Sequence, residues 1–371
     1  MKIVILVRIL WSAGAQRIAI KEAKELHQSG HDVKLIFLRR GKTWGVYSRL
    51  LQDVDYEVIS EGNSSIFSGL YSFMTGLFMP DRRGEGRVDY DLLRKFPEIV
   101  KKLNPDKIIC HDEWAGYAGF LSKRKYGIPY EVYLHERLGS LDVPLIGKIA
   151  LRLRDRILRN AEKVYSVTQK IASDTNMRFG YNVVSNPPGF DRLKSLPSNE
   201  RRNSVASIAM WDANRDPYFF IQLEKYLHGY EIDLVGNWRD ESYYENFKKN
   251  LPEGTFLLLK RGISEAKKEE IISKSKYLVR FGKREFGLAT AVIESISSGT
   301  PVIINEELGT ADMIRESGAG YVLDSAEPEL AAKLILETSQ EKYDQMVKNT
   351  LKLRDTLTWT DHAKKLVSSC N

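Results

Sequence analysis

The sequence is poor in cysteine and has no long apolar run. Two cysteines, Cys110 and Cys370, occur among 371 residues, so no disulfide framework is expected and the chain fits a reducing compartment. The absence of any stretch of about eighteen apolar residues argues against a membrane-spanning helix. The apolar run at Met1–Arg8 is too short for a signal peptide and is expected to form a buried strand. Internal repeats, zinc-type Cys/His spacing and low-complexity tracts are also missing, which disfavours solenoid, structural-zinc and disordered classes.

The composition indicates a folded protein with a positive charge that attracts anionic partners. With 371 residues, of which 43% are hydrophobic, the chain can build two α/β domains of ordinary size. The formal net charge is +7. A positive surface suits nucleotide phosphates, acidic membranes or nucleic acid, and the charge alone leaves all three open.

Residues 277–305 carry the pattern around which the chain is organised. Tyr277–Phe281 is predicted to be a buried strand, a helix is predicted from about Leu288 to Ser298, and Val302–Ile304 is predicted to be the next strand. Gly299 is the expected end of the helix. In such a βαβ unit, the loop after the first strand lies where open α/β sheets bind ligands, and the helix N-terminus suits a phosphate.

Two carboxylates bracket this turn. Glu285 lies in the predicted loop and Glu294 lies about two turns into the predicted helix. A sugar diphosphate on the helix N-terminus could place its hydroxyls near both. The same spacing also fits an ordinary solvated helix residue and a carboxylate that favours the helix dipole. The spacing alone leaves both interpretations open.

The residue string strengthens the functional interpretation. Glu285-Phe-Gly-Leu, followed by Glu294-Ser-Ile-Ser-Ser-Gly-Thr-Pro-Val-Ile, resembles the signature of retaining GT-B glycosyltransferases, specifically glycosyltransferase family 4. Eight residues lie between the two glutamates, one more than in the family's pattern. Glu294 keeps the family register. Glu285 is predicted to fill the first role, because a loop absorbs a one-residue change of length without rotating the helix.

The resemblance implies both fold and function. The implied fold class is α/β, GT-B, with two Rossmann-like doubly wound domains facing a central cleft. The implied domains are an acceptor-binding domain at 1–190, a nucleotide-sugar-binding domain at 191–355, and a helix at 356–371 that returns to the first domain. The implied reaction moves a sugar, as a hexosyltransferase does, from a nucleotide-diphosphate sugar to a hydroxyl with retention of anomeric configuration, in glycan or glycolipid assembly. The acceptor would be a glycan, a lipid-linked or a small molecule, and no metal or other cofactor is expected.

The resemblance also implies the site residues. The catalytic residues are His135, at the end of the strand predicted at 130–134, and Glu285, which would meet the donor sugar. A second histidine, His111, follows an equivalent strand. Residues implied to bind the nucleotide-sugar are Gly14, Arg215, Lys260, Ile263, Phe286, Gly287, Leu288 and Glu294.

Arg215 and Glu294 receive specific roles within that set. Arg215 would clamp the donor diphosphate and Glu294 would accept hydrogen bonds from the ribose hydroxyls. The family's second clamp position holds Met210 here, so Arg280, Lys283 or Arg284 is expected to compensate.

Two segments have patterns that would suit contact with a membrane surface. Residues 62–80 are rich in large apolar side chains, and Arg82, Arg83 and Arg87 follow directly. This pattern suits contact with anionic lipid, and equally a core helix under the first sheet. A basic stripe on the helix predicted at 146–164 favours an ordinary solvated face and leaves membrane contact open. The expected location is cytoplasmic, with peripheral attachment to the inner face of the membrane as an open alternative.

Two other functions also fit the sequence. A nucleotide-sugar epimerase shares the GT-B fold and needs no acceptor. A non-catalytic membrane- or nucleic-acid-binding protein would also use the positive charge. Nucleic acid is disfavoured as a partner, because the basic residues follow one helix and a few loops and no nucleic-acid-binding module is recognisable.

Overall fold

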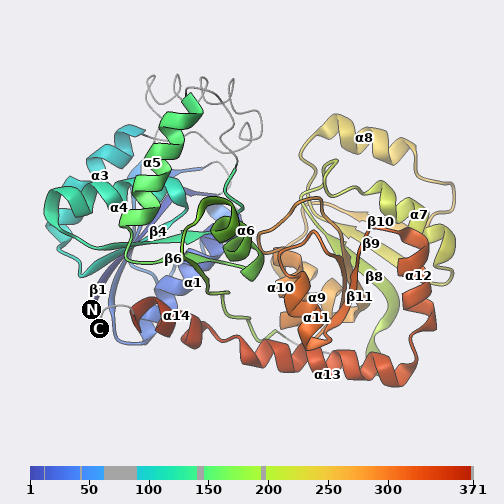
Figure 1. The fold of residues 1–371 in the computed structure, drawn as a ribbon. Helices are drawn as coiled ribbons and strands as arrows, with labels where there is room; N and C mark the ends of the chain where they lie inside the picture. Colours follow the sequence, from blue (N-terminus) through green and yellow to red (C-terminus); the bar gives the residue numbers. More distant parts are fainter. Residues whose placement is uncertain (12, 42–43, 62–89, 140–145, 194–197, 369–371) are drawn as a thin grey trace. The chain divides into compact units, whose positions relative to one another are not determined.

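The computed structural model describes residues 1–11, 13–41, 44–61, 90–139, 146–193 and 198–368. The chain divides into two compact units, drawn in Figure 1. Unit 1 combines Met1–Pro188 with Trp359–Asn371, and unit 2 is the continuous stretch Gly189–Thr358. The apolar segment at 66–79 and the arginines that follow it lie outside the described residues.

Unit 1 is built on a parallel sheet. Within the described residues it has seven strands in the order β3-β2-β1-β4-β5-β6-β7. Strand β1, in the interior of this sheet, is buried along most of its length, as its apolar sequence predicts. The strands are β1 (Lys2–Leu10), β2 (Asp32–Arg40), β3 (Tyr56–Ser60), β4 (Lys107–His111), β5 (Tyr130–Leu134), β6 (Val164–Ser166) and β7 (Val183–Ser185).

Helices connect and cover these strands. α3, α4 and α5 pack in sequence, and α1 packs on α14 (Figure 1). The Asp112 carboxylate caps α4 by accepting hydrogen bonds from two backbone N–H groups at 2.8 Å, and Gly127 ends that helix with a positive φ of 73°. The helices are α1 (Gly14–Gln28), α3 (Tyr90–Leu103), α4 (Glu113–Tyr126), α5 (Ile146–Asn160), α6 (Gln169–Phe179) and α14 (Trp359–Val367), with a 3-10 turn η1 at Trp44–Tyr47.

Unit 2 repeats the plan with a smaller sheet. Its described strands are all parallel and follow the order β10-β9-β8-β11-β12-β13. The strands are β8 (Arg202–Ile208), β9 (Glu231–Val235), β10 (Leu257–Lys260), β11 (Ser275–Arg280), β12 (Val302–Asn305) and β13 (Gly320–Leu323).

Five helices of unit 2 lie between these strands in the chain, and α12 and α13 follow the last strand among the described residues. They are α7 (Tyr218–Tyr226), α8 (Glu241–Lys249), α9 (Glu265–Lys274), α10 (Thr290–Ser297), α11 (Ala311–Ser317), α12 (Pro328–Glu337) and α13 (Gln340–Thr356), after a 3-10 turn η3 at Ser198–Glu200. α7 packs on α12, and α10 packs on α9 and α13.

Helix α10 begins later than the sequence indicated. The prediction placed its start at about Leu288, but the first helical residue is Thr290 and Ala289 is extended. A distant segment of the chain holds the preceding turn, because the Gly309 N–H donates to the Glu285 carbonyl at 2.8 Å. A Cβ on Gly309 would collide with the Phe286 carbonyl. This close approach keeps the Phe286-Gly287 turn out of the helix.

The fold class predicted from the sequence is confirmed in both units. Each sheet reverses its strand order at one point, between β1 and β4 in unit 1 and between β8 and β11 in unit 2. These are the topological switch points of doubly wound α/β folds, where ligands bind beyond the carboxyl ends of the strands. Among the described residues, no helix combines the length and apolar character needed to cross a bilayer.

Candidate active site

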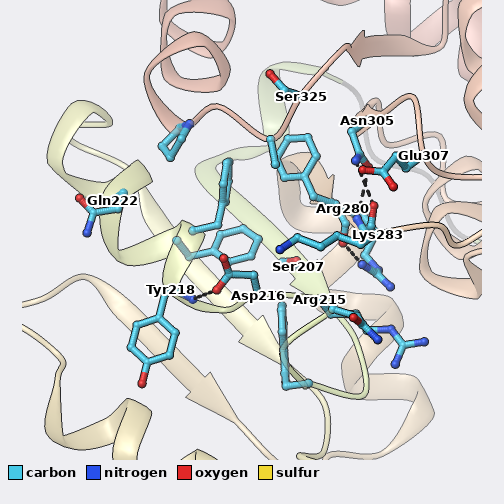
Figure 2. A pocket seen from close by; sticks show the side chains of 18 of the residues that line it. Ser207, Arg215, Asp216, Tyr218, Gln222, Arg280, Lys283, Asn305, Glu307 and Ser325 are labelled. Atoms are coloured by element: carbon cyan, nitrogen blue, oxygen red, sulfur yellow. Dashed lines mark hydrogen bonds between the residues drawn. The ribbon is translucent and has the colours of Figure 1, made fainter. Parts of the chain in front are cut away.

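A cavity opens at the carboxyl ends of the strands of unit 2. Its volume is about 360 Å³. Figure 2 shows Arg280 and Lys283 grouped with Asn305 and Glu307 on one side of it. Aromatic side chains of Trp211, Phe219 and Phe281 complete the wall. The cavity therefore combines an apolar lining with several cations, a combination that suits an anionic organic ligand.

Two arginines converge on one glutamate beside this cavity. Arg215 Nη2 donates to Glu285 Oε1 at 3.2 Å, and Arg280 Nη2 donates to Glu285 Oε2 at 2.5 Å. Arg280 is 3% exposed. Burial lowers the pKa of the Arg280 guanidinium, while the Glu285 charge opposes that shift. The expectation that Arg280 would join Arg215 therefore has a geometric basis, with Glu285 as the group that both of them bind.

The loop after β8 presents Arg215. The Asp212 carboxylate accepts hydrogen bonds from the N–H groups of Asn214 and Arg215 at 3.1 and 3.2 Å, which closes a short turn. The Arg215 side chain also donates to the Met210 carbonyl at 3.1 Å. Lys283 N–H donates to the Asn214 carbonyl at 3.3 Å, so the loops after β8 and β11 are joined directly.

The loop after β11 presents Glu285. Asn305 at the end of β12 exchanges two hydrogen bonds with the Gly282 backbone, at 3.2 and 3.0 Å. Arg284 has a positive φ of 53°, and its N–H donates to Glu307 Oε2 at 2.8 Å. A Cβ at Gly282 would lie 2.5 Å from a Glu285 carboxylate oxygen, so a larger residue there would displace that carboxylate. These contacts fix the loop in which the extra residue of the motif is accommodated.

Glu294 lies elsewhere in unit 2. It is on α10, is 7% exposed, and its Oε1 accepts from Lys268 Nζ at 2.8 Å. Lys268 comes from α9 and also pairs with Glu265 at 2.8 Å. Burial works against the Lys268 charge, but Glu294 and Glu265 raise its pKa overall. Sequence patterns do not single out Lys268, because it lies in a run of mixed charges that is typical of a solvated helix face.

The other residues of unit 2 that were predicted to bind the nucleotide-sugar do not line this cavity. Lys260 ends β10, its ammonium pairs with Asp233, and its carbonyl accepts from Gly236 N–H at 3.0 Å. Ile263 packs against the core cluster that contains Ile271. Phe286, Gly287 and Leu288 lie in the turn before α10. Of the predicted residues in this unit, Arg215 lines the cavity and is joined to Glu285.

In unit 1, Gly14 is the first residue of α1, directly after β1. The preceding carbonyl, of Ala13, accepts from the Tyr47 hydroxyl at 2.8 Å. Gln16 is buried and its amide donates to the Ile9 carbonyl at 2.9 Å. This turn therefore lies at the carboxyl end of β1, at the switch point of the first sheet.

His135 lies at the carboxyl end of β5 in contact with a second histidine. His135 Nε2 is 2.8 Å from His111 Nδ1, and the two rings stack with centroids 5.0 Å apart. Burial holds the pKa of His135 well below its usual range. His135 is therefore a neutral imidazole at neutral pH.

Two buried residues that the sequence did not single out stand behind His111. Glu22 of α1 lies with Oε2 2.6 Å from His111 Nε2 and with Oε1 2.6 Å from Nε2 of His362, which belongs to α14. Burial tends to raise the pKa of Glu22, but His111 and His362 lower it well below its usual range. The sequence could not identify either residue as part of a site, because each occupies an ordinary polar position in an amphipathic helix.

Two protein-family models match parts of the chain. The family model described as Glycosyltransferase Family 4 matches residues 12–192, and the model described as Glucosyltransferase 3-like, C-terminal domain, matches residues 294–370. The chain is a glycosyltransferase of the family 4 type. This match confirms the family resemblance that the sequence motif indicated.

Solved structures agree on the fold of this glycosyltransferase. Anabaena Alr3699/HepE in complex with UDP and glucose is 14% identical, with 100% of this chain and 99% of that chain covered and a TM-score of 0.77. The same Anabaena protein in complex with UDP-glucose gives 15%, 100% of both chains and 0.75. The lipopolysaccharide outer core galactosyltransferase WaaB gives 14%, 99% of both chains and 0.71. No curated protein matches the sequence significantly.

Proposed function

We propose that this glycosyltransferase transfers a hexosyl group from a UDP-sugar to an acceptor hydroxyl with retention of the anomeric configuration. The observation that carries the proposal is the convergence of Arg215 and Arg280 on Glu285 beside the cavity. Two guanidinium groups held on one carboxylate supply the positive charge that a departing diphosphate requires. The complexes of the Anabaena protein with UDP and UDP-glucose support a uridine donor.

The proposed reaction exchanges anions at the two arginines. The donor diphosphate takes over Arg215 and Arg280, and Lys283 adds a third positive charge at the cavity wall. Glu285, released from Arg215, then faces the donor sugar and stabilises the positive charge that grows at its anomeric carbon. The bond from that carbon to the phosphate oxygen breaks while the bond to the acceptor oxygen forms. The acceptor's proton passes to the leaving phosphate, so no separate base is required.

Two further residues complete the proposed donor site. Glu294 accepts hydrogen bonds from the ribose hydroxyls, and Lys268 holds its carboxylate in place through the 2.8 Å ion pair. His135 of unit 1 is the second catalytic residue in this proposal. Metal ions take no part in this proposal, because the three cationic side chains Arg215, Arg280 and Lys283 carry the charge of the diphosphate.

The acceptor in this proposal is a glycan, a lipid-linked or a small-molecule hydroxyl. We place the protein in the cytoplasm, with peripheral attachment to anionic lipid on the inner face of the membrane. The net charge of +7 and the arginines that follow the apolar segment at 66–79 support that attachment.

The test is an assay of donor, acceptor and product together. The purified protein is incubated with UDP-glucose or GDP-glucose, with and without a panel of acceptors, and nucleotide release and product are followed by NMR. The proposal expects UDP release that depends on the acceptor, and a product with the donor's anomeric configuration. A product of inverted configuration would refute retention. An epimerised or free sugar from donor alone would favour an epimerase instead.

A further inference from the structure

Four side chains in unit 1 form a continuous polar chain, which we call the histidine relay: His362, Glu22, His111 and His135. The consecutive contacts measure 2.6, 2.6 and 2.8 Å. The relay is anchored at its far end, where His362 Nδ1 lies 3.0 Å from the Pro187 carbonyl oxygen. Glu22 is fully buried, and His111 and His362 are each 2% exposed. Water therefore has little access to the first three members, and each must satisfy its protons within the relay.

The anchor fixes the protons on His362. The Pro187 carbonyl oxygen only accepts, so the proton between it and His362 Nδ1 belongs to the ring. A second proton must lie in the 2.6 Å contact between His362 Nε2 and Glu22 Oε1, because two lone pairs would repel at that distance. The pKa of Glu22 is lowered, so its Oε1 acts as the acceptor in this contact and the ring nitrogen carries the hydrogen.

The protons on His111 follow from those on Glu22. Glu22 Oε2 and His111 Nε2 are 2.6 Å apart, which is too close for two lone pairs, so the ring nitrogen carries a hydrogen although the two groups are not aligned as a hydrogen bond. His111 is 2% exposed, so a second proton on its ring would place a further charge in a buried site. Its Nδ1 therefore faces His135 Nε2, at 2.8 Å, with a lone pair.

We propose that Glu22, His111 and His362 are positioning residues that hold His135 as the neutral Nε2–H tautomer, with a lone pair at Nδ1 for a substrate hydroxyl. Within the described residues, Nδ1 of His135 has no hydrogen-bond partner. His135 can then accept a hydroxyl proton in a hydrogen bond but cannot donate one from Nδ1. The inference rests on the proposed function for the identity of the hydroxyl, which belongs to the sugar donor or the acceptor.

The tautomer is measured directly in the free protein. Long-range proton–nitrogen NMR on the full chain labelled with 15N-histidine, at neutral pH, reports the protonation of each ring nitrogen. The His135 signals are assigned by their loss in His135→Asn. The expected pattern is protonated Nε2 and unprotonated Nδ1. An Nδ1–H tautomer or an imidazolium at His135 overturns the proposal. The measurement needs no turnover, so it fails or succeeds separately from the proposed sugar transfer.

Substitutions test whether the relay sets this pattern. His111→Phe keeps a ring to stack on His135 and removes the acceptor. We expect mixed tautomers at His135 and a fall of about tenfold in kcat, the effect of one hydrogen bond. The Kd for UDP should stay within about twofold, because the diphosphate is proposed to bind unit 2. A pure Nε2–H tautomer or an unchanged kcat in this variant overturns the proposal.

A matched pair at Glu22 separates positioning from packing. In Glu22→Gln the amide oxygen still accepts from His111 while the amide N–H donates to a neutral His362, so the His135 tautomer should persist. Glu22→Met has similar length and no acceptor, so the tautomer should be lost. Retention of the tautomer in Glu22→Met overturns the proposal, and if that variant does not fold, the His111→Phe spectrum decides the question alone.

Discussion

Replacing Glu285 by Gln removes one charge at the point where both site arginines converge. In the free protein the carboxylate accepts from Arg215 at 3.2 Å and from Arg280 at 2.5 Å. The amide keeps the shape and one acceptor but leaves the buried Arg280 guanidinium without its nearest anion. A hydrogen bond to a charged group contributes roughly 1.5–3 kcal/mol. The free energy of unfolding of Glu285→Gln should therefore fall by about 2 kcal/mol.

The same change should favour a nucleoside diphosphate. Glu285 occupies the arginines as an anion would, so the ligand must displace it before binding. With the carboxylate gone, the diphosphate restores the missing charge, and its Kd should fall by about tenfold, equivalent to ~1.4 kcal/mol. Turnover should fall sharply, because Glu285 is proposed to act on the transition state rather than on the nucleotide. Saturating UDP should then stabilise the variant more than the native protein.

Calorimetric titration of UDP, thermal unfolding with and without UDP, and kcat at saturating donor measure these three effects. Glu241→Gln is the matched control: it breaks a bidentate pair with Arg261 on the surface of the same unit. It should change neither UDP binding nor turnover. Weaker UDP binding by Glu285→Gln would refute the competition argument. Near-normal turnover by a well-folded Glu285→Gln protein would remove Glu285 from the catalytic role and leave His135 as the candidate.

Four other measurements test the site. Arg215→Ala should weaken UDP binding by roughly 1.5–3 kcal/mol in calorimetry, and an unchanged Kd contradicts its role as a diphosphate clamp. Glu294→Gln should weaken donor binding more than kcat and abolish any preference for UDP over 2′,3′-dideoxy-UDP; a surviving preference would place the ribose elsewhere. Turnover should survive EDTA, and loss of activity restored by a divalent cation would show that a metal takes part. Replacing Phe73 and Phe78 by Ser should release the protein from anionic vesicles at low salt, whereas a much lower melting temperature would identify both as core residues.

The contacts of Glu285 with the two arginines show which part of the site could be predicted from the sequence. Arg215 and Glu285 are 70 positions apart, yet each follows a predicted buried strand of the same unit. Because the carboxyl ends of parallel strands meet at one edge of a sheet, strand ends bring such residues together without further information. The pattern also predicted that Arg280, Lys283 or Arg284 would replace the missing clamp. It could not choose among them, since that choice depends on side-chain direction and on contacts from Asn305 and Glu307.

The sequence could not predict contacts between polar residues that are far apart in the chain. Glu22 and His362 are 340 positions apart, and Lys268 reaches Glu294 from another helix. Hydrophobic periodicity locates the buried face of a helix but assigns no partner to a polar residue on it. Helix boundaries failed for a similar reason. The start of α10 is set by the approach of Gly309 to Phe286, a contact between segments more than twenty residues apart in the chain.

The return of α14 to unit 1 has a consequence for biosynthesis. A ribosome delivers the chain from its amino end, and domains generally fold as they emerge. Unit 2 is one continuous stretch and can fold as soon as it is released. Unit 1 must wait for the last helix, which brings His362 to Glu22 and the Leu366 carbonyl to Lys107. The nascent protein should therefore complete its amino-terminal half last, and a chaperone would meet it with that half still open.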